Sequence, residues 1–297
     1  MTQLAVHARE GRYDLEEIRH IYRTQGLVVL KEFHAPQSRA DVRQILERRL
    51  EWARTADHIL KFDIYPQADF LLGDLLAIRE LEKYDYLFFR AELLRIVAGL
   101  LETPELIYCG DSSVQYGEAA RGFHKDNVER YDGSHDDWIG DYGLIRCAFY
   151  CQDHTVHSGG LKVRLRSHNI ATHLRGKIAD VGTQYGDVVL WSMRLTHSGN
   201  NKKLRLLGGL PLHPRLEMVC PAFLTLTEQA RRISCFCSFA RPGSHAERYI
   251  ANLNVRAADY KEYFRRARKP TETAELMRRY GVVFRQPNDY YGELNRA

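Results

Sequence analysis

The sequence of 297 residues has six cysteines but no C-x-x-C pair, and most of the cysteines lie in apolar, strand-like runs such as ISCFCSF. This spacing argues against a cysteine-based metal site and against a catalytic cysteine. Cysteines scattered in this way are typical of buried, reduced thiols in a cytosolic protein. The sequence therefore favours a reducing compartment.

Long apolar runs are also absent. The most apolar segment, YDYLFFRAELLRIVAGLL, is interrupted by Arg90, Glu92 and Arg95, and does not reach membrane-spanning length. The opening residues, MTQLAVHAREGRYDLEE, show no apolar core of a secretory signal. We therefore expect a cytoplasmic protein.

The net charge of +5 is unevenly placed, because residues 241–297 carry twelve Lys and Arg against seven Asp and Glu. A solvated helical face is the simpler interpretation of this tail, and peripheral contact with an anionic membrane surface is the alternative. We expect no nucleic-acid partner, and the sequence leaves the oligomeric state open.

The pattern of elements predicts one domain with three parts. Residues 1–104 read as mostly helical, with a helix in DLEEIRHIYRTQ that ends at Gly26 and another that Ser38 caps. Residues from about 105 to 250 show short β-branched and aromatic runs separated by Gly, Asp or Asn, which favours an antiparallel sandwich or barrel. Residues 251–297 form a helical basic tail. The predicted fold class is mainly β with flanking helices, a double-stranded β-helix (jelly roll, cupin-like).

Residues 206–230 break this rhythm with three prolines and read as an insertion. The segment RRISCFCSFARP then resumes as a strand.

Two His-x-Asp triplets lie a few residues apart in RGFHKDNVERYDGSHDDW. With 13 histidines in the chain, chance alone supplies roughly 0.8 such triplets, so the match itself carries little weight. His135 lies in the Gly- and Asp-rich stretch DGSHDDWIGD, which is typical of a solvated loop. His124 and Asp126 follow a short apolar–polar alternation at the end of a candidate strand, so this pair is the better metal site.

A catalytic iron site needs a third ligand, and His197 in GDVVLWSMRLTHSGN is the candidate. It follows a buried-looking strand, and the neighbouring strands of a jelly roll can bring it to His124 and Asp126. Taken alone, His197 is more simply explained as a structural histidine.

A carboxylate co-substrate would need a cation, and Arg is suited to this role because its planar fork pairs with a carboxylate. The candidates after His197 are Arg205, Arg231 and Arg232. Just upstream of the first triplet, Gln115 is a candidate for lining the pocket.

At these residues the chain resembles the phytanoyl-CoA dioxygenase family of Fe(II)/2-oxoglutarate oxygenases. The resemblance covers most of the chain and rests on the order of its motifs. LEEIRHIYRTQGLVVLKEF is similar to the family's opening helix and strand, and GFHKDN to its first-ligand motif. SGGLKVRLRSHN, GDVVLWSMRLTHSGNN and RRISCFCSFA resemble the later segments, in that order.

The resemblance implies that His124, Asp126 and His197 ligate Fe(II) and serve as the catalytic centre. It also implies that an arginine after His197 binds 2-oxoglutarate. Strand alternation places Arg232 on the same side as Ser234, which makes Arg232 the first choice and Arg205 the second.

The implied activity uses dioxygen and 2-oxoglutarate to hydroxylate an unactivated C–H bond. Asp126 is in keeping with hydroxylation, because halogenating relatives lose this carboxylate. The substrate is a small molecule or a glycolipid and is expected to be anionic: a Kdo-type lipopolysaccharide sugar, an acyl-CoA or a biosynthetic intermediate. The alternatives are a zinc hydrolase that uses the same three side chains, and a jelly-roll binding module without catalysis.

Overall fold

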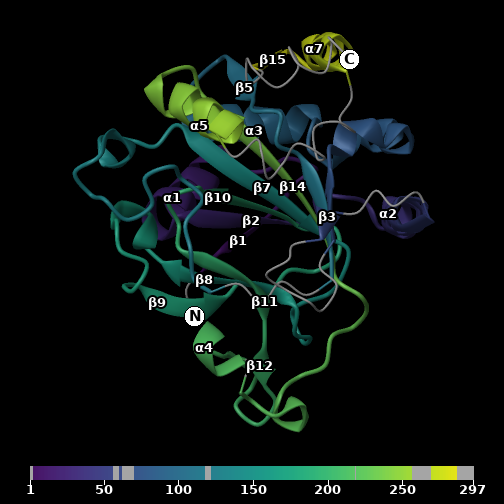
Figure 1. The fold of residues 1–297 in the computed structure, drawn as a ribbon, viewed down its shortest axis with the longest axis vertical. Helices are drawn as coiled ribbons and strands as arrows, with labels where there is room; N and C mark the ends of the chain where they lie inside the picture. The colour runs from purple at the N-terminus through teal and green to yellow at the C-terminus, as the bar shows by residue number, and fades with distance from the viewer. Residues whose placement is uncertain are drawn as a thin grey trace.

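The computed structural model describes residues 3–55, 60–61, 70–117, 122–217, 219–255 and 269–285 (Figure 1). Its centre is a ten-stranded mixed sheet in which the strands run in the order β1-β2-β10-β7-β14-β6-β4-β3, with β5 beside β14 and β15 beside β5. The strands of this main sheet are β1 (Ala5–His7), β2 (Leu27–Lys31), β3 (Leu60–Lys61), β4 (Phe70–Gly73), β5 (Leu106–Tyr108), β6 (Ser113–Tyr116), β7 (Leu144–Tyr150), β10 (Val188–Ser192), β14 (Ile233–Ala240) and β15 (Val282–Phe284).

The α-helices are α1 (Leu15–Gln25), α2 (Pro36–Thr55), α3 (Ala91–Leu101), α4 (Pro214–Glu217), α5 (Ser244–Val255) and α7 (Pro270–Arg279). Four of the α-helices, α1, α2, α3 and α7, cover the outer face of the main sheet, whereas α5 packs in a separate apolar cluster and α4 lies in the connection to β14. Short 3-10 helices are η1 (Leu75–Ala77), η2 (Arg79–Leu87), η3 (Asp136–Trp138), η4 (Ser167–Asn169) and η5 (Ala222–Leu224). The apolar faces of α1, α2 and α3 join the outer side chains of β2, β7, β10 and β14 in one large core.

The inner face of the main sheet packs against a second, three-stranded sheet. This sheet consists of β8 (Gly160–Leu165), β9 (Lys177–Asp180) and β11 (His197–Asn201), in the order β11-β8-β9. Strand β10 shows how both faces are filled, because its side chains alternate. Leu190 belongs to the outer core, and Val189 and Trp191 belong to the core between the sheets. The mainly β fold with flanking helices confirms the predicted fold class.

The expected insertion forms a separate projection below the second sheet (Figure 1). The small sheet of β12 (Lys203–Leu204) and β13 (Leu210–Pro211) is followed by α4 and η5 before the chain returns to β14. Two buried ion pairs hold its base, one from Lys162 to Glu217 and one of 2.5 Å from Lys203 to Asp180.

Several predicted elements agree with the structure and one does not. Helix α1 ends at Gly26, which has the left-handed φ of 87°. The predicted N-cap at Ser38 is wrong, because α2 already begins at Pro36 and the Ser38 hydroxyl donates a hydrogen bond to the carbonyl of Ala35. The segment read as mostly helical also supplies strands β1 to β4 to the main sheet. Most of the predicted helical basic tail, residues 256–268 and 286–297, lies outside the described residues, and α7 is its one described complete helix.

All six cysteines are unpaired, and five of them are buried. Within the part of the chain that the structure describes, no helix is long and apolar enough to span a bilayer.

Candidate metal centre and co-substrate cradle

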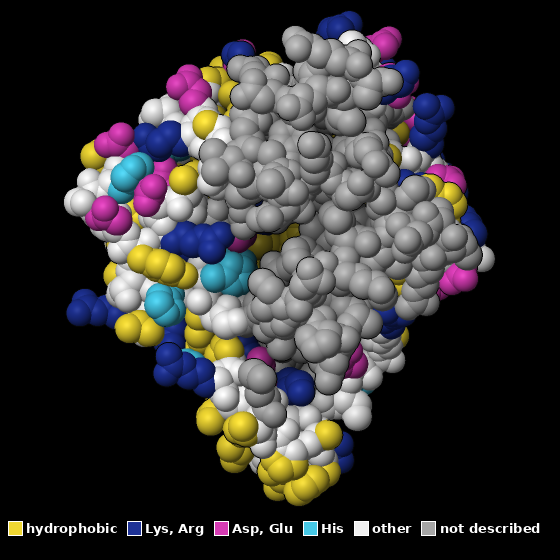
Figure 2. Space-filling view, in the orientation of Figure 1, with side chains coloured by type: hydrophobic (Ala, Val, Ile, Leu, Met, Phe, Trp, Pro, Cys, Tyr) yellow, Lys and Arg dark blue, Asp and Glu magenta, His cyan; other side chains and the backbone are white. Residues whose placement is uncertain are grey.

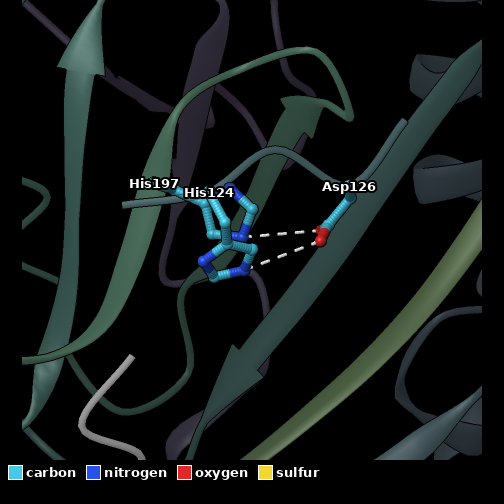
Figure 3. Close-up of side chains that lie close together, drawn as sticks. All are labelled: His124, Asp126 and His197. Atoms are coloured by element: carbon cyan, nitrogen blue, oxygen red, sulfur yellow. Dashed lines mark ion pairs between the residues drawn. The ribbon is translucent and has the colours of Figure 1, made fainter. Parts of the chain in front are cut away.

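The side chains of His124, Asp126 and His197 converge between the two sheets (Figure 3). One potential ligand atom from each lies within 4.8 Å of the other two. The Nε2 atom of His124 is 3.7 Å from Oδ1 of Asp126, and Nε2 of His197 is 3.5 Å from Oδ2. We name these three residues the metal triad. The structure thus brings together the three ligands suggested by the sequence.

Both imidazoles are oriented by the backbone. Nδ1 of His124 lies 3.0 Å from the carbonyl of Gly122, and Nδ1 of His197 lies 3.0 Å from the carbonyl of Leu195. A carbonyl oxygen can only accept, so each Nδ1 carries a proton, and in the neutral ring Nε2 is then the unprotonated nitrogen. This is the tautomer required for coordination through Nε2.

Backbone hydrogen bonds fix the distance between the two halves of the triad. The peptides of His124 and His197 exchange two N–H···O bonds of 3.0 and 2.9 Å in an isolated β-bridge. The carbonyl of Met193 accepts from the backbone N–H groups of Asp126 and Asn127 at 2.8 and 3.1 Å. The first-ligand segment is therefore joined to the β10–β11 segment that carries the distal histidine.

Asp126 is held in its ionised form. Burial opposes ionisation, but the electrostatic attraction of the neighbouring His197, Arg146, His124 and Arg130 outweighs it and keeps the pKa of Asp126 well below its usual range. Burial lowers the pKa of His197, which favours the neutral imidazole. Two neutral nitrogens and one carboxylate oxygen form the donor set suited to Fe(II), with two-histidine, one-carboxylate composition. The residues present therefore fit a divalent iron ion.

Arg232 lies beside this triad, immediately before β14, and is only 2% exposed. Its Nε donates a hydrogen bond of 2.9 Å to the carbonyl of Gly159. Its Nη2 lies 3.4 Å from the position that a Cβ would occupy at Gly199, two residues after the ligand His197. The guanidinium carbon is 5.7 Å from the centre of the Tyr150 ring.

The strand register builds a polar cradle around Arg232. Gln115 on β6 and Tyr150 on β7 both pair with Ser234 on β14, so the three side chains point to the same face, as does Arg232 two residues earlier. Among the described residues, Nε2 of Gln115 and Oγ of Ser234 are buried without a hydrogen-bond partner. We name Gln115, Tyr150, Arg232 and Ser234 the cradle.

Buried polar atoms without partners are costly unless a ligand or water satisfies them. A buried cation beside two such groups fits the distal carboxylate of a dicarboxylic keto acid. The cradle therefore has the composition that 2-oxoglutarate would need.

The other candidate arginines lie elsewhere. Arg205 is exposed on the projection, where its guanidinium donates to the carbonyl of Thr225 at 3.3 Å. Arg231 is exposed, next to Arg232 in the chain. Of these three arginines, only Arg232 is buried beside the triad.

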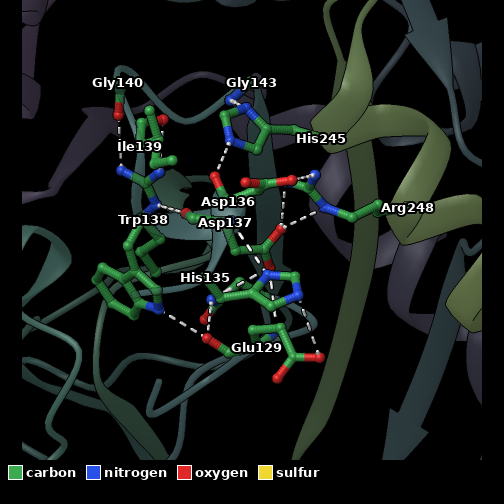
Figure 4. Close-up of polar contacts among 12 residues, drawn as sticks. Glu129, His135, Asp136, Asp137, Trp138, Ile139, Gly140, Gly143, His245 and Arg248 are labelled. Carbon is green, nitrogen blue, oxygen red and sulfur yellow. Dashed lines mark hydrogen bonds and ion pairs between the residues drawn. The ribbon is translucent and has the colours of Figure 1, made fainter. Parts of the chain in front are cut away.

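The second His-x-Asp triplet has a structural role (Figure 4). His135 is the N-cap of η3, and Asp137 is fully buried. The Asp137 carboxylate accepts from the backbone N–H of Glu129 at 3.0 Å and pairs with Arg248 of α5 at 3.1 Å. This triplet braces the loop after Asp126 against α5, and Asp137 also accepts a hydrogen bond of 3.3 Å from the side chain of Asn127.

Sequence reasoning missed Arg146 on β7. Its Nε is 3.7 Å from Oδ2 of Asp126, and its Nη1 is 2.6 Å from Oδ2 of the buried Asp111. Asp111 also accepts hydrogen bonds from the hydroxyls of Ser238 and Tyr249. The available signal was a charged residue in the middle of the apolar strand GLIRCAFYC.

No protein-family model and no curated protein sequence matches the chain. Solved structures do share its fold. AviO1 from Streptomyces viridochromogenes Tue57 is 18% identical with a TM-score of 0.52, over 78% of this chain and 96% of that one. HygX from Streptomyces hygroscopicus, solved with nickel and 2-oxoglutarate, is 16% identical with a TM-score of 0.52, over 75% and 86%. The epimerase SnoN, solved with Fe3+, alpha ketoglutarate and nogalamycin RO, is 14% identical with a TM-score of 0.50, over 76% and 83%. At these identities the likeness establishes the fold.

Proposed function

We propose that this protein is an Fe(II)- and 2-oxoglutarate-dependent oxygenase of the phytanoyl-CoA dioxygenase type. The observation that carries the proposal is the convergence of the metal triad within 4.8 Å, with the Nδ1 of each histidine facing a backbone carbonyl. Two solved structures of the same fold, HygX and SnoN, contain 2-oxoglutarate together with nickel or iron. Their shared fold makes the same cofactors the natural choice for this triad.

Each group has a defined task. His124, Asp126 and His197 hold Fe(II), which supplies dioxygen activation and oxidation of the keto acid when both are bound. Arg232 binds the distal carboxylate of 2-oxoglutarate, and Gln115 and Ser234 offer it further hydrogen bonds. Burial of the cradle excludes water and strengthens this ion pair. The Nδ1 contacts with backbone carbonyls leave the Nε2 atom of each histidine directed toward Asp126.

The cradle also distinguishes this proposal from a zinc hydrolase. A hydrolase needs the metal and a bound water, but has no use for a buried arginine with unpartnered neighbours at the far end of the site. A jelly-roll binding module without catalysis would need neither the metal triad nor the cradle. The oxygenase accounts for both features.

Hydroxylation of an unactivated C–H bond in a small molecule is the proposed reaction outcome. HygX has been solved with hygromycin B, and SnoN, an epimerase, with nogalamycin RO. Epimerisation is the second candidate, because the same fold and cofactors occur in SnoN. A small molecule is the substrate class that these neighbours suggest.

The test is anaerobic reconstitution with Fe(II) followed by measurement of succinate from 2-oxoglutarate in air, with and without candidate substrates. Addition of 2-oxoglutarate to the anaerobic Fe(II) protein should produce the visible charge-transfer band of a chelated keto acid. Mass spectrometry of the product then separates hydroxylation, with a gain of one oxygen atom, from epimerisation, with no change in mass. Zinc-dependent hydrolysis without oxygen uptake would refute the oxygenase.

A further inference from the structure

The projection between β11 and β14 exposes an unusual amount of apolar surface. Six of its large hydrophobic side chains are more than half exposed, and they make up more than half of all such residues in the described part of the chain. They are Leu206 (82%), Leu207 (62%), Leu210 (53%), Leu216 (52%), Val219 (74%) and Phe223 (73%). We name these six residues the apolar tip. Figure 2 shows hydrophobic side chains gathered at this lower end of the molecule.

The tip is presented by a firmly held base. Lys203 is 1% exposed and pairs with Asp180, and Lys162 is fully buried and pairs with Glu217. The backbone of Leu226 donates to the carbonyl of Lys203 at 2.8 Å, which closes the projection at its root. Large apolar side chains that stay exposed on a well-held base are typical of an interaction surface.

The exposed charged side chains of the projection before Arg231 are positive. Two acidic residues belong to the projection: Glu217 is buried in its pair with Lys162, and Glu228 lies at its root beside Gly159. Arg205 and Arg215 are exposed, and Lys202 is half-buried. A surface of leucine, valine and phenylalanine flanked by cations matches the interface of an anionic bilayer, where apolar side chains insert and basic ones meet head groups.

We propose that the apolar tip docks the protein on an anionic lipid surface. A second copy of the chain fits less well, because a contact between two tips would bring Arg205 and Arg215 against their own copies. The tip protrudes, so it offers no groove for a peptide segment.

The projection also adjoins the metal site. His213 packs edge-to-face on Phe123, with ring centres 5.6 Å apart, and Phe123 directly precedes the ligand His124. The guanidinium carbon of Arg164 lies over the same Phe123 ring, 4.6 Å from its centre. Docking through the tip would thus place the rim of the metal site close to the lipid surface. The docking itself does not depend on the proposed oxygenase activity.

The test is flotation of the full-length protein with vesicles of phosphatidylcholine alone, or of an equal mixture of phosphatidylcholine and phosphatidylglycerol. We expect binding to the mixed vesicles. Leu207→Ser with Phe223→Ser should weaken it by about tenfold or more, since two inserted side chains are lost. Arg205→Gln with Arg215→Gln should weaken binding to the mixed vesicles selectively, and high salt should do the same.

The matched control is Val156→Ser with Leu174→Ser, which removes side chains of 62% and 64% exposure on other loops and should leave lipid binding unchanged. Unchanged circular dichroism and unchanged metal binding show that each variant is folded. Absence of wild-type binding to either vesicle would overturn the proposal. So would equal losses in the control variant, or a wild-type dimer that Leu207→Ser with Phe223→Ser converts to a monomer.

Discussion

Arg146 lies between two carboxylates, with its Nε 3.7 Å from Oδ2 of the metal-triad residue Asp126 and its Nη1 2.6 Å from Oδ2 of Asp111. It also donates to the hydroxyl of Ser238 at 2.8 Å. One cation therefore lies beside the Asp126 carboxylate and the buried Asp111 carboxylate of the surrounding core. The side chains of Arg146, Asp126 and Asp111 are 17%, 18% and 7% exposed, so solvent screens these pairs only weakly.

Arg146→Gln should lower the free energy of unfolding of the metal-free protein by about 3 kcal/mol, because it leaves a buried carboxylate without its cation. The double variant Arg146→Gln with Asp111→Asn should recover part of this loss. Urea unfolding monitored by circular dichroism measures both. The control is Arg23→Gln. The ion pair of Arg23 with Glu102 joins side chains that are 62% and 50% exposed, so its loss should lower the free energy of unfolding by less than about 1 kcal/mol. Equal losses of unfolding free energy in Arg146→Gln and Arg23→Gln would contradict the stabilising role of the buried Arg146.

The two His-x-Asp triplets provide a matched comparison of metal binding. His124→Ala should weaken binding of Fe(II) or Co(II) by about 100-fold or more, since one of three ligands is lost. His135→Ala should leave metal affinity unchanged, because His135 caps η3 outside the triad. Anaerobic titration with Co(II), followed by its visible spectrum, measures both affinities. Loss of metal binding in His135→Ala would show that the wrong triplet has been assigned.

Arg232 and Arg231 provide a comparison between neighbours in the chain. Arg232→Gln should raise the KM for 2-oxoglutarate by about tenfold or more, because a buried, charge-assisted contact is lost. Arg232→Lys should restore only part of it, since an ammonium lacks the planar fork. Arg231→Gln should leave the KM unchanged. Succinate formation and the affinity of the anaerobic protein for 2-oxoglutarate give independent readouts, and equal changes at both positions would rule out the specific role of Arg232.

Buried histidines should make the protein acid-sensitive. Burial lowers the pKa of His34 and His154 to about 3 and that of His168 to about 4, from the ordinary 6.5. Below about pH 6.5 the unfolded chain takes up protons at these residues while the folded protein does not, so stability is complete above this pH and falls as the pH drops. Each histidine contributes at most about 1.4 kcal/mol per pH unit in this window.

The variant His34→Phe tests this dependence. His34 lies edge-on to Phe33 and Phe149, with ring centres 5.3 and 4.9 Å away, so an aromatic replacement suits the site. Urea unfolding should show a shallower loss of stability between about pH 6.5 and 4 in the variant, and parallel curves above that window. Identical slopes in the acid range would contradict a neutral, buried His34.

The fold class followed from local patterns, because strands covered on both faces require apolar runs of the kind seen in β7 and β10. His124 and Asp126 were separable from the second triplet by their surroundings alone. The alternation of β14 was also sufficient to place Arg232 and Ser234 on one face. These features depend on a few adjacent residues, so they could be predicted from the sequence.

The role of Arg146 depends on long-range register. Strand β7 places it opposite Ser238 of β14 and Trp191 of β10, and neither pairing is encoded in residues near position 146. The start of α2 at Pro36 is a different case, because Pro at the first helical position competes with Ser38 as a start signal. The exposed surface of the projection was unpredictable for a third reason, since a Pro-rich apolar segment does not reveal what covers it.

The backbone carbonyls two residues before each ligand histidine have a consequence for how this site can vary. The proton at Nδ1 of each ring is bound by a carbonyl within a three-residue unit, Gly122–His124 or Leu195–His197. Substitutions elsewhere in the cavity can then change its shape and charge, and therefore the molecule that it binds, while the orientation of the His124 and His197 rings stays the same. Such separation would allow the same fold to bind a different molecule while His124, Asp126 and His197 keep their positions.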